Sequence, residues 1–166
     1  MPRVNVEAFL AKVVGRDEAT FVAENPHCVL VEVEASDSAA GAESTEHLDA
    51  AAVRRQASGA CDAIVLTLDP AQTPLPLGRG SQNALVVDHT SISKVHAKLE
   101  LREGQWWLID LGSTNGTQLN RKRLEGNQAV QLKPDDDVHF GKGCGFHYLD
   151  ARGFFAYLQL LRRFGL

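Results

Sequence analysis

The chain has 166 residues, of which 44% are hydrophobic and 23% are charged. A chain of this length suits one domain with an appendage, and it buries roughly 70% of its unfolded surface, so its folding requires neither a disulfide nor a metal. Seventeen Lys and Arg residues against twenty-one Asp and Glu residues give a net charge of −4. That balance argues against a general binder of nucleic acid or of membrane surfaces. No apolar run approaches the roughly 18 residues of a membrane span.

Two features predict where the protein works. The first residues lack the apolar stretch and the small-residue cleavage site of a signal peptide. Cys28, Cys61 and Cys144 lie far apart, without a CxxC pair. We therefore expect reduced, mostly buried thiols rather than a disulfide framework or a metal site. Together these features predict a cytoplasmic protein without a metal or another cofactor.

Residues 1–60 are predicted to form a mainly helical extension. Apolar residues repeat at helical spacing from Val6 to Val14, Asn5 is a suitable N-cap, and Gly15 ends the pattern. Asp17 is predicted to start a second helix that ends before Pro26. Residues 27–34 alternate as a strand does, residues 35–44 resemble a mobile linker, and a third helix is predicted from about residue 44 to 56.

The periodicity changes to two after residue 61. Short apolar runs, separated by Gly, Pro, Asn or Asp every eight to twelve residues, continue to about residue 149 and indicate an antiparallel sandwich or barrel. Residues 150–166 return to helical spacing. The wide apolar face of that predicted C-terminal helix, which includes Phe154, Leu158 and Leu161, requires packing on the body of the protein or on a partner.

Four short motifs follow one another in the β-rich part. They are Gly78-Arg79, then Ser93-x-x-His96, then Ser113-Thr114-Asn115-Gly116-Thr117, and finally Leu132-Lys133-Pro134-Asp135-Asp136 with Phe140-Gly141. Asn-Gly alone is only a turn. In this order and spacing, however, the four motifs resemble the forkhead-associated (FHA) domain family, with a bacterial member favoured. The resemblance covers about residues 62–149, and we assign residues 61–149 as an FHA domain.

This resemblance implies an eleven-stranded antiparallel β-sandwich that binds phosphothreonine peptides on loops at one end. A phosphothreonine carries about −1.5 to −2 charges and three acceptor oxygens, so its reader needs a cation and short donors on a rigid platform. The phosphopeptide-binding residues implied by the resemblance are Arg79, Ser91, Ser93, Lys94, Thr114, Asn115 and Asn120. The residues implied to support the site are Gly78, His96 and Gly116.

Each of these residues also has an ordinary structural interpretation. The alternative for Arg79 and Lys94 is a solvated surface cation, and for Ser93 it is a turn cap. Asn120 could equally be a turn residue. Ser91 departs from the family pattern, since some relatives carry an arginine there that contacts the ligand. His96 is expected to be a buried support that holds the Ser93 and Asn115 loops in register, not a catalyst or a metal ligand.

The sequence therefore predicts a phosphothreonine-dependent interaction module, without enzyme activity, that recruits partners phosphorylated by a Ser/Thr kinase. Its partner would be a phosphothreonine-containing protein or the kinase itself. A second interpretation is an FHA-type scaffold that works without phosphate and forms a homodimer through its terminal helices. Thr45, within Glu43-Ser44-Thr45-Glu46, is either a helix N-cap or a phosphorylation site that docks into another copy.

Overall fold

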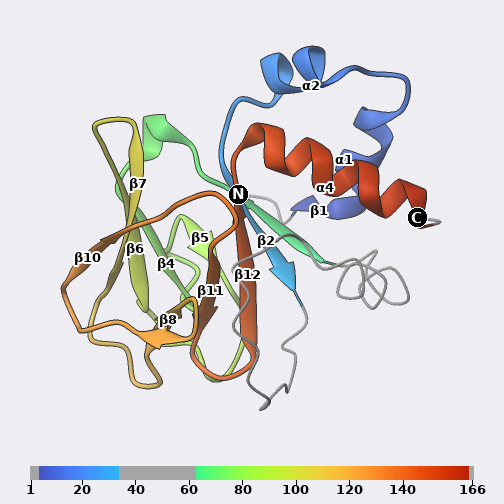
Figure 1. Cartoon of the computed structure of the whole chain (residues 1–166). Coiled ribbons are helices and arrows are strands. Elements are labelled where there is room, and N and C mark those ends of the chain that lie inside the picture. Colours follow the sequence, from blue (N-terminus) through green and yellow to red (C-terminus); the bar gives the residue numbers. More distant parts are fainter. Residues whose placement is uncertain (1–3, 34–62, 165–166) are drawn as a thin grey trace.

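The computed structural model describes residues 4–33 and 63–164. Two β-sheets lie face to face, and helices cover the outer face of the larger sheet at one end (Figure 1). Within the described residues, no helix is long and apolar enough to cross a membrane. The linker, the third helix and Thr45 discussed above lie outside these residues.

The larger sheet joins strands from both parts of the chain. Its seven described strands run in the order β1-β3-β2-β12-β11-β8-β9. Their bounds are β1 Val4–Asn5, β3 Ile64–Thr67, β2 Val29–Val33, β12 Cys144–Leu149, β11 Asp137–Phe140, β8 Thr117–Leu119 and β9 Lys122–Arg123. All the pairs in this sheet are antiparallel.

The smaller sheet has five described strands in the order β10-β7-β6-β4-β5. Their bounds are β10 Ala129–Gln131, β7 Gln105–Asp110, β6 Ala97–Arg102, β4 Leu75–Gly78 and β5 Leu85–Val86. A short 3-10 helix, Pro70–Gln72, precedes β4. The pair β4–β5 is parallel, which departs from the wholly antiparallel sandwich predicted from the sequence.

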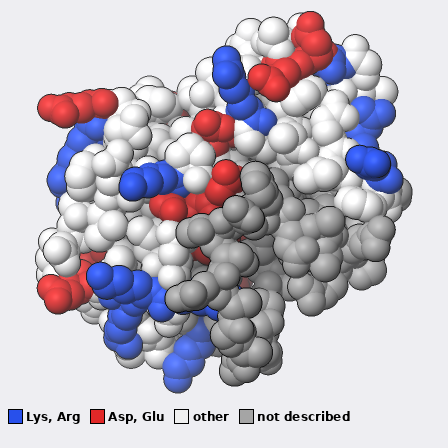
Figure 2. Space-filling model, in the orientation of Figure 1, with Lys and Arg blue, Asp and Glu red and all other residues white. Residues whose placement is uncertain are grey.

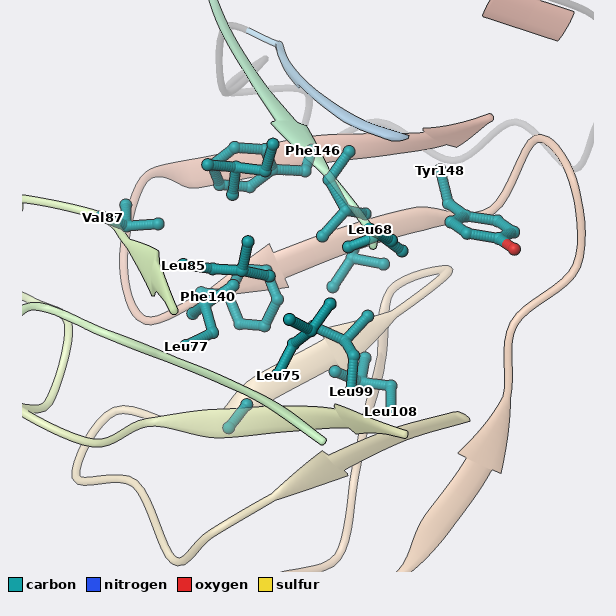
Figure 3. Packing of buried hydrophobic residues seen from close by; sticks show 14 of the residues in the cluster. Leu68, Leu75, Leu77, Leu85, Val87, Leu99, Leu108, Phe140, Phe146 and Tyr148 are labelled. Atoms are coloured by element: carbon teal, nitrogen blue, oxygen red, sulfur yellow. The ribbon is translucent and has the colours of Figure 1, made fainter. Parts of the chain in front are cut away.

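The space between the sheets holds the main core (Figure 3). Leu75, Leu77, Leu99 and Leu108 of the smaller sheet lie opposite Phe140 and Phe146 of the larger one. Alternation along the strands explains this layer, because successive side chains of a strand point to opposite faces of the sheet. The period of two read from the sequence therefore sets which residues fill the sandwich.

A second cluster joins the helices to the outer face of the larger sheet. Val29 and Val31 of β2 belong to it, whereas Leu30 between them lies in the sandwich core. The helices are α1 (Val6–Val13), α2 (Glu18–Glu24) and α4 (Ala151–Arg163). Asn5 and Asp17 cap α1 and α2, as the sequence predicted, and Asp150 caps α4. The helices therefore form a third layer on the sandwich.

The mainly β fold with helices at both ends is confirmed, but the division of strands differs from the prediction. Eleven strands were expected, whereas the described residues form seven strands in one sheet and five in the other. The strand predicted at 27–34 is β2, which lies between β3 and β12 and so belongs to the sandwich itself. The pairing of β2 with β3 and β12 joins residues far apart in the sequence, so the local sequence pattern does not predict it. The domain limits of 1–60, 61–149 and 150–166 stay predictions.

Candidate functional site

The predicted site residues lie mostly on loops at one end of the sandwich. The strand register places the end of β4, the start of β6 and the end of β7 together, since Leu77 pairs with Ala97 and Ala97 with Asp110. On the other sheet, Thr117 at the start of β8 pairs with Phe140 at the end of β11. The β11–β12 turn marks this end at the bottom of Figure 1, and the helices lie toward the opposite end.

Gly78 and Arg79 lie where β4 ends against the β5–β6 loop. The Arg79 N–H donates to the Ser93 carbonyl over 2.9 Å, and the Gly80 N–H donates to the Lys94 carbonyl over 3.0 Å. A Cβ on Gly78 would lie 2.3 Å from the Lys94 carbonyl oxygen. Only glycine permits this approach of two backbones. Residue 79 is thereby fixed beside Ser93, and its exposed guanidinium pairs with no carboxylate among the residues that the structure describes.

Asn83 fastens the same two loops and was not identified from the sequence. Its side chain is 6% exposed, and Nδ2 donates to the Gly80 carbonyl over 2.7 Å and to the Lys94 carbonyl over 2.6 Å. Its Oδ1 is buried without a hydrogen-bond partner among the described residues. A buried amide with two donors between carbonyls holds a loop as a backbone ladder would. The only signal in the sequence that could have identified Asn83 is its position four residues after Arg79.

His96 connects the Ser93 loop with the β7–β8 loop. The ring is fully buried, and its Nδ1 accepts the Ser93 N–H over 3.1 Å. A backbone N–H can only donate, so the proton lies on Nε2, which donates to the Gly116 carbonyl over 2.9 Å. Burial lowers the pKa of His96, against the opposing effects of the Gly116 hydrogen bond and the Asp110 charge. The ring is therefore a neutral strut between two loops.

Ser93, Thr114 and Asn115 meet above this strut. The Thr114 N–H donates to the Ser93 hydroxyl over 3.1 Å, which leaves the Ser93 hydrogen to donate outward. One Asn115 amide N–H donates to the Ser91 carbonyl over 2.8 Å. Its other N–H and its oxygen have no hydrogen-bond partner within residues 4–33 and 63–164. Since the Thr114 N–H is already used, the hydroxyl is the group of Thr114 that remains for a ligand.

Asp110 shapes the β7–β8 loop from inside. Its carboxylate accepts the Ser113 hydroxyl over 2.6 Å, the Thr117 hydroxyl over 2.7 Å, and the N–H groups of Gly112 and Ser113. Burial is the largest single influence and raises the pKa of Asp110, but these hydrogen bonds together hold it below its ordinary value. The Ser113 hydroxyl in turn accepts the Gly116 N–H over 3.0 Å. The turn that carries Asn115 is therefore rigid.

Ser91 has a different place from the one expected. Its hydroxyl donates to the Lys142 carbonyl over 2.9 Å and accepts the Lys142 N–H over 2.9 Å. It also lies 2.8 Å from Nδ1 of His89. A Cβ on Gly141 would lie 2.5 Å from the Ser91 carbonyl oxygen, at a φ of +63°. The Ser91 side chain therefore holds the β11–β12 turn, and its carbonyl orients Asn115.

The structure does not bring Asn120 to these residues. It follows β8 at the end away from Thr117, and its Nδ2 donates to Asp136 over 2.8 Å while its Oδ1 accepts the Asp137 N–H over 2.9 Å. The oxygen and the nitrogen of the Asn120 amide are thus both bonded within a turn. This is the alternative role that the sequence analysis gave for Asn120. Lys94 does lie at the site, with its carbonyl bound by Gly80 and Asn83 and its side chain exposed.

The assembled groups suit an anion joined to an extended chain. Arg79 and Lys94 supply charge, Ser93 and Thr114 supply hydroxyls, and Asn115 supplies an amide that can bond a peptide main chain. Within residues 4–33 and 63–164, no group of three His, Cys, Asp or Glu side chains is placed to hold a metal ion.

Comparison with known proteins identifies the same segment. The family model of the FHA domain matches residues 76–141. The FHA domain-containing protein FhaB of Mycobacterium tuberculosis is 37% identical over 71 residues, which are 43% of this chain and 44% of that protein. The oxoglutarate dehydrogenase inhibitor of Corynebacterium glutamicum is 32% identical over 65 residues, 39% of this chain and 43% of that protein. The chain thus spans less than half the length of these relatives.

A solved structure shows the same fold. The solution structure of the FHA domain of an Arabidopsis thaliana hypothetical protein superposes with a TM-score of 0.53, covering 75% of this chain and 85% of that one at 22% identity. The matched residues 76–141 include the loops of Arg79, Ser93 and Asn115. The fold, the order of the motifs and the family match agree, and the chain therefore contains an FHA domain that includes the matched residues 76–141.

Proposed function

We propose that this chain is a phosphothreonine-dependent protein interaction module that recruits partners phosphorylated by a Ser/Thr kinase. The observation that carries the proposal is the convergence of Arg79, Ser93 and Asn115, from three separate loops, at one end of the sandwich. We propose that the site binds its ligand, and the proposal includes no chemical reaction of that ligand.

The roles of the residues follow from their free donors. Arg79 presents a guanidinium that can donate two parallel hydrogen bonds to a phosphate, and Lys94 adds a flexible second charge. The hydroxyls of Ser93 and Thr114 donate to the remaining phosphate oxygens. Asn115 bonds the main chain beside the phosphothreonine, which fixes the direction of the peptide. Ser91, Gly78, His96 and Gly116 then act as supports, together with Asn83.

A threonine in place of a serine would be recognised by its methyl group. We propose that Thr114 lines the niche for that methyl, whose burial contributes about 0.8 kcal/mol. A preference for phosphothreonine larger than this value requires an additional cost when phosphoserine binds. An empty niche, which water does not fill, would supply that cost.

The scaffold interpretation finds less support. It needs the apolar faces of the terminal helices for a dimer, but Phe9 and Val13 of α1 and Leu158 and Leu161 of α4 are buried within one chain. The free thiols of Cys28 and Cys144 suit a reducing compartment, which supports the proposed cytoplasmic location.

The proposal is tested by calorimetry with a library of phosphothreonine peptides, followed by the best peptide in its phosphorylated and unphosphorylated forms. We expect binding only of the phosphorylated form. Arg79→Ala should weaken it about a hundredfold or more, because two charge-assisted bonds of about 1.5–3 kcal/mol each are lost. Arg102→Ala is the matched control, an exposed arginine at the far end of β6. Equal affinity of Arg79→Ala and the wild type would reject the site.

A further inference from the structure

Arg123 packs its guanidinium on the backbone of Gly116. A Cβ on Gly116 would lie 2.8 Å from Cζ of Arg123 and 2.9 Å from one of its terminal nitrogens, so the guanidinium occupies the space that a side chain at 116 would need. Arg123 pairs with Gln118 across the β8–β9 hairpin, and Gly116 lies two residues before Gln118. Cross-strand partners share a face of the sheet, as do residues two apart, so the contact is a diagonal one on the exposed face.

The hairpin that carries Arg123 is held in place. Asn120 and Arg121 form its tight turn with φ values of 49° and 68°, and the Asn120 amide bonds Asp136 and Asp137. Lys122 faces the opposite side of β9, because neighbouring residues of a strand point apart. Arg123 is therefore the cation of this hairpin whose guanidinium lies against Gly116.

Positive charge gathers around the site although the chain as a whole is acidic. The loops at this end hold Arg79, Lys94 and Lys142, and Arg123 of the β8–β9 hairpin lies against Gly116. The acids of the same loops are Asp88 and Glu125. At the far turn of the hairpin, in contrast, Asn120 bonds Asp136 and Asp137. Figure 2 shows Lys and Arg side chains gathered over and below β8. No ion pair joins Arg123 to a carboxylate of residues 4–33 or 63–164.

We propose that Arg123 is a second anion contact of the site and binds an acidic side chain that flanks the phosphothreonine. This inference rests on the function proposed above, and it names the class of ligand: a phosphothreonine segment with a carboxylate or a second phosphate close by. Thr114 and Gly116 are two residues apart, so their Cα atoms are at most about 7.6 Å from each other. A flanking residue of an extended peptide advances about 3.3 Å per position, which lets a neighbouring acid reach Arg123 while the phosphate stays near Ser93 and Thr114.

Glycine at 116 makes the contact directional. With no Cβ beneath it, the guanidinium rests flat against the turn and presents its edge, and a planar fork binds a carboxylate or a phosphate through two parallel hydrogen bonds. A lysine in the same place would supply a charge without that geometry. The proposal therefore predicts a preference at one or two peptide positions rather than a general attraction to acidic peptides.

The test compares one reference peptide with a set of peptides that differ from it only in their flanks. The reference peptide carries phosphothreonine among alanines, and each peptide of the set has a single glutamate at one position from −3 to +4. We expect the wild type to bind the peptide with glutamate at one or two positions roughly three- to tenfold more tightly than the alanine peptide. Arg123→Gln should abolish that gain, so that it binds the glutamate peptides no more tightly than it binds the alanine peptide. Arg123→Lys should keep part of the gain, and Lys122→Gln, the control on the opposite face, should keep all of it.

The outcomes separate this inference from the proposed function. If the alanine peptide fails to bind the wild type, the phosphothreonine site itself is wrong. If that peptide binds but no position responds to glutamate, or if Lys122→Gln loses the gain as fully as Arg123→Gln, then Arg123 is not a specific contact. An equal loss for both peptides in Arg123→Gln also overturns the inference, because it shows that Arg123 only supports the turn.

Discussion

The imidazole of His96 donates to the carbonyl oxygen of Gly116 over 2.9 Å, while its other nitrogen accepts the N–H of Ser93. Two loops that are about twenty residues apart in the sequence thus share one buried ring. The Gly116 carbonyl also accepts the Gly141 N–H over 2.9 Å, so the β11–β12 turn joins the same network. The positions of the Ser93 and Asn115 side chains therefore depend on the hydrogen bonds of the buried His96 ring.

His96→Gln is expected to lower the free energy of unfolding at pH 8 by about 1–3 kcal/mol, since two buried hydrogen bonds change. Burial lowers the pKa of His96 in the folded state, whereas in the unfolded chain it lies at the ordinary value of 6.5. Below pH 6.5 the unfolded state binds the extra proton first, so His96 contributes less stability as the pH falls. Urea denaturation from pH 8 to pH 5 should show the gap between wild type and variant narrowing; a constant gap would contradict a buried neutral ring.

Asn83→Ala should weaken phosphopeptide binding although Asn83 itself faces inward. The substitution removes two hydrogen bonds, to the carbonyls of Gly80 and Lys94, and leaves both carbonyls without this donor. We expect a loss of about 1–3 kcal/mol in stability and a clear loss of affinity, because the loop that carries Arg79 loses its side-chain hydrogen bond to the Lys94 carbonyl. Denaturation and calorimetry measure the two effects. Unchanged affinity in the folded variant would show that the loop keeps its shape without Asn83.

Gly78→Ala and Gly80→Ala form a matched pair. A Cβ at 78 would lie 2.3 Å from the Lys94 carbonyl oxygen, which is backbone held by hydrogen bonds from Gly80 and Asn83, whereas a Cβ at 80 would meet only the side chain of Gln82. A side chain moves away at little cost and a packed backbone does not. Gly78→Ala should therefore destabilise the protein by about 1–3 kcal/mol or more, and Gly80→Ala by much less. Thermal denaturation that ranks the two variants in the reverse order would contradict this packing.

Leu158→Ala tests whether the helical layer belongs to the folded unit. Leu158 of α4 is fully buried in the second hydrophobic cluster, which joins the helices to the outer face of the larger sheet. Its truncation should cost about 2–5 kcal/mol of stability. Arg162→Ala, an exposed residue of the same helix, is the control. Peptide affinity should persist while the variant is folded, because the cluster lies at the other end of the sandwich; a normal stability would show that α4 packs elsewhere.

Affinity for a phosphothreonine peptide should fall as the pH drops below about 6, where the phosphate gains a proton and loses charge. The same fall is expected in His96→Gln, because the proton lies on the ligand and not on the ring. Calorimetry at pH 5, 6, 7 and 8 measures both proteins. A flat profile in the wild type would exclude recognition of the dianion, and a profile that flattens only in His96→Gln would assign the titration to His96.

Local patterns in the sequence determined the elements and the order of the motifs. Helical spacing and capping residues predicted α1, α2 and α4, and alternation predicted most strands, because these features depend on neighbours within a few residues. The motifs from Gly78 to Gly141 identified the family and named Arg79, Ser93, His96 and Asn115 for the same reason: each is a short, ordered signature.

Only the tertiary structure decided which residues share a contact across long stretches of chain. It placed β2 inside the larger sheet, put Asn83 against Lys94, joined Ser91 to Lys142 and laid Arg123 on Gly116. It also showed that Asn120 serves a turn. Such contacts depend on strand register and on the close approach of backbones, and many sequences with the same local pattern satisfy neither. The residues that support and flank the site could therefore be identified only from the tertiary structure.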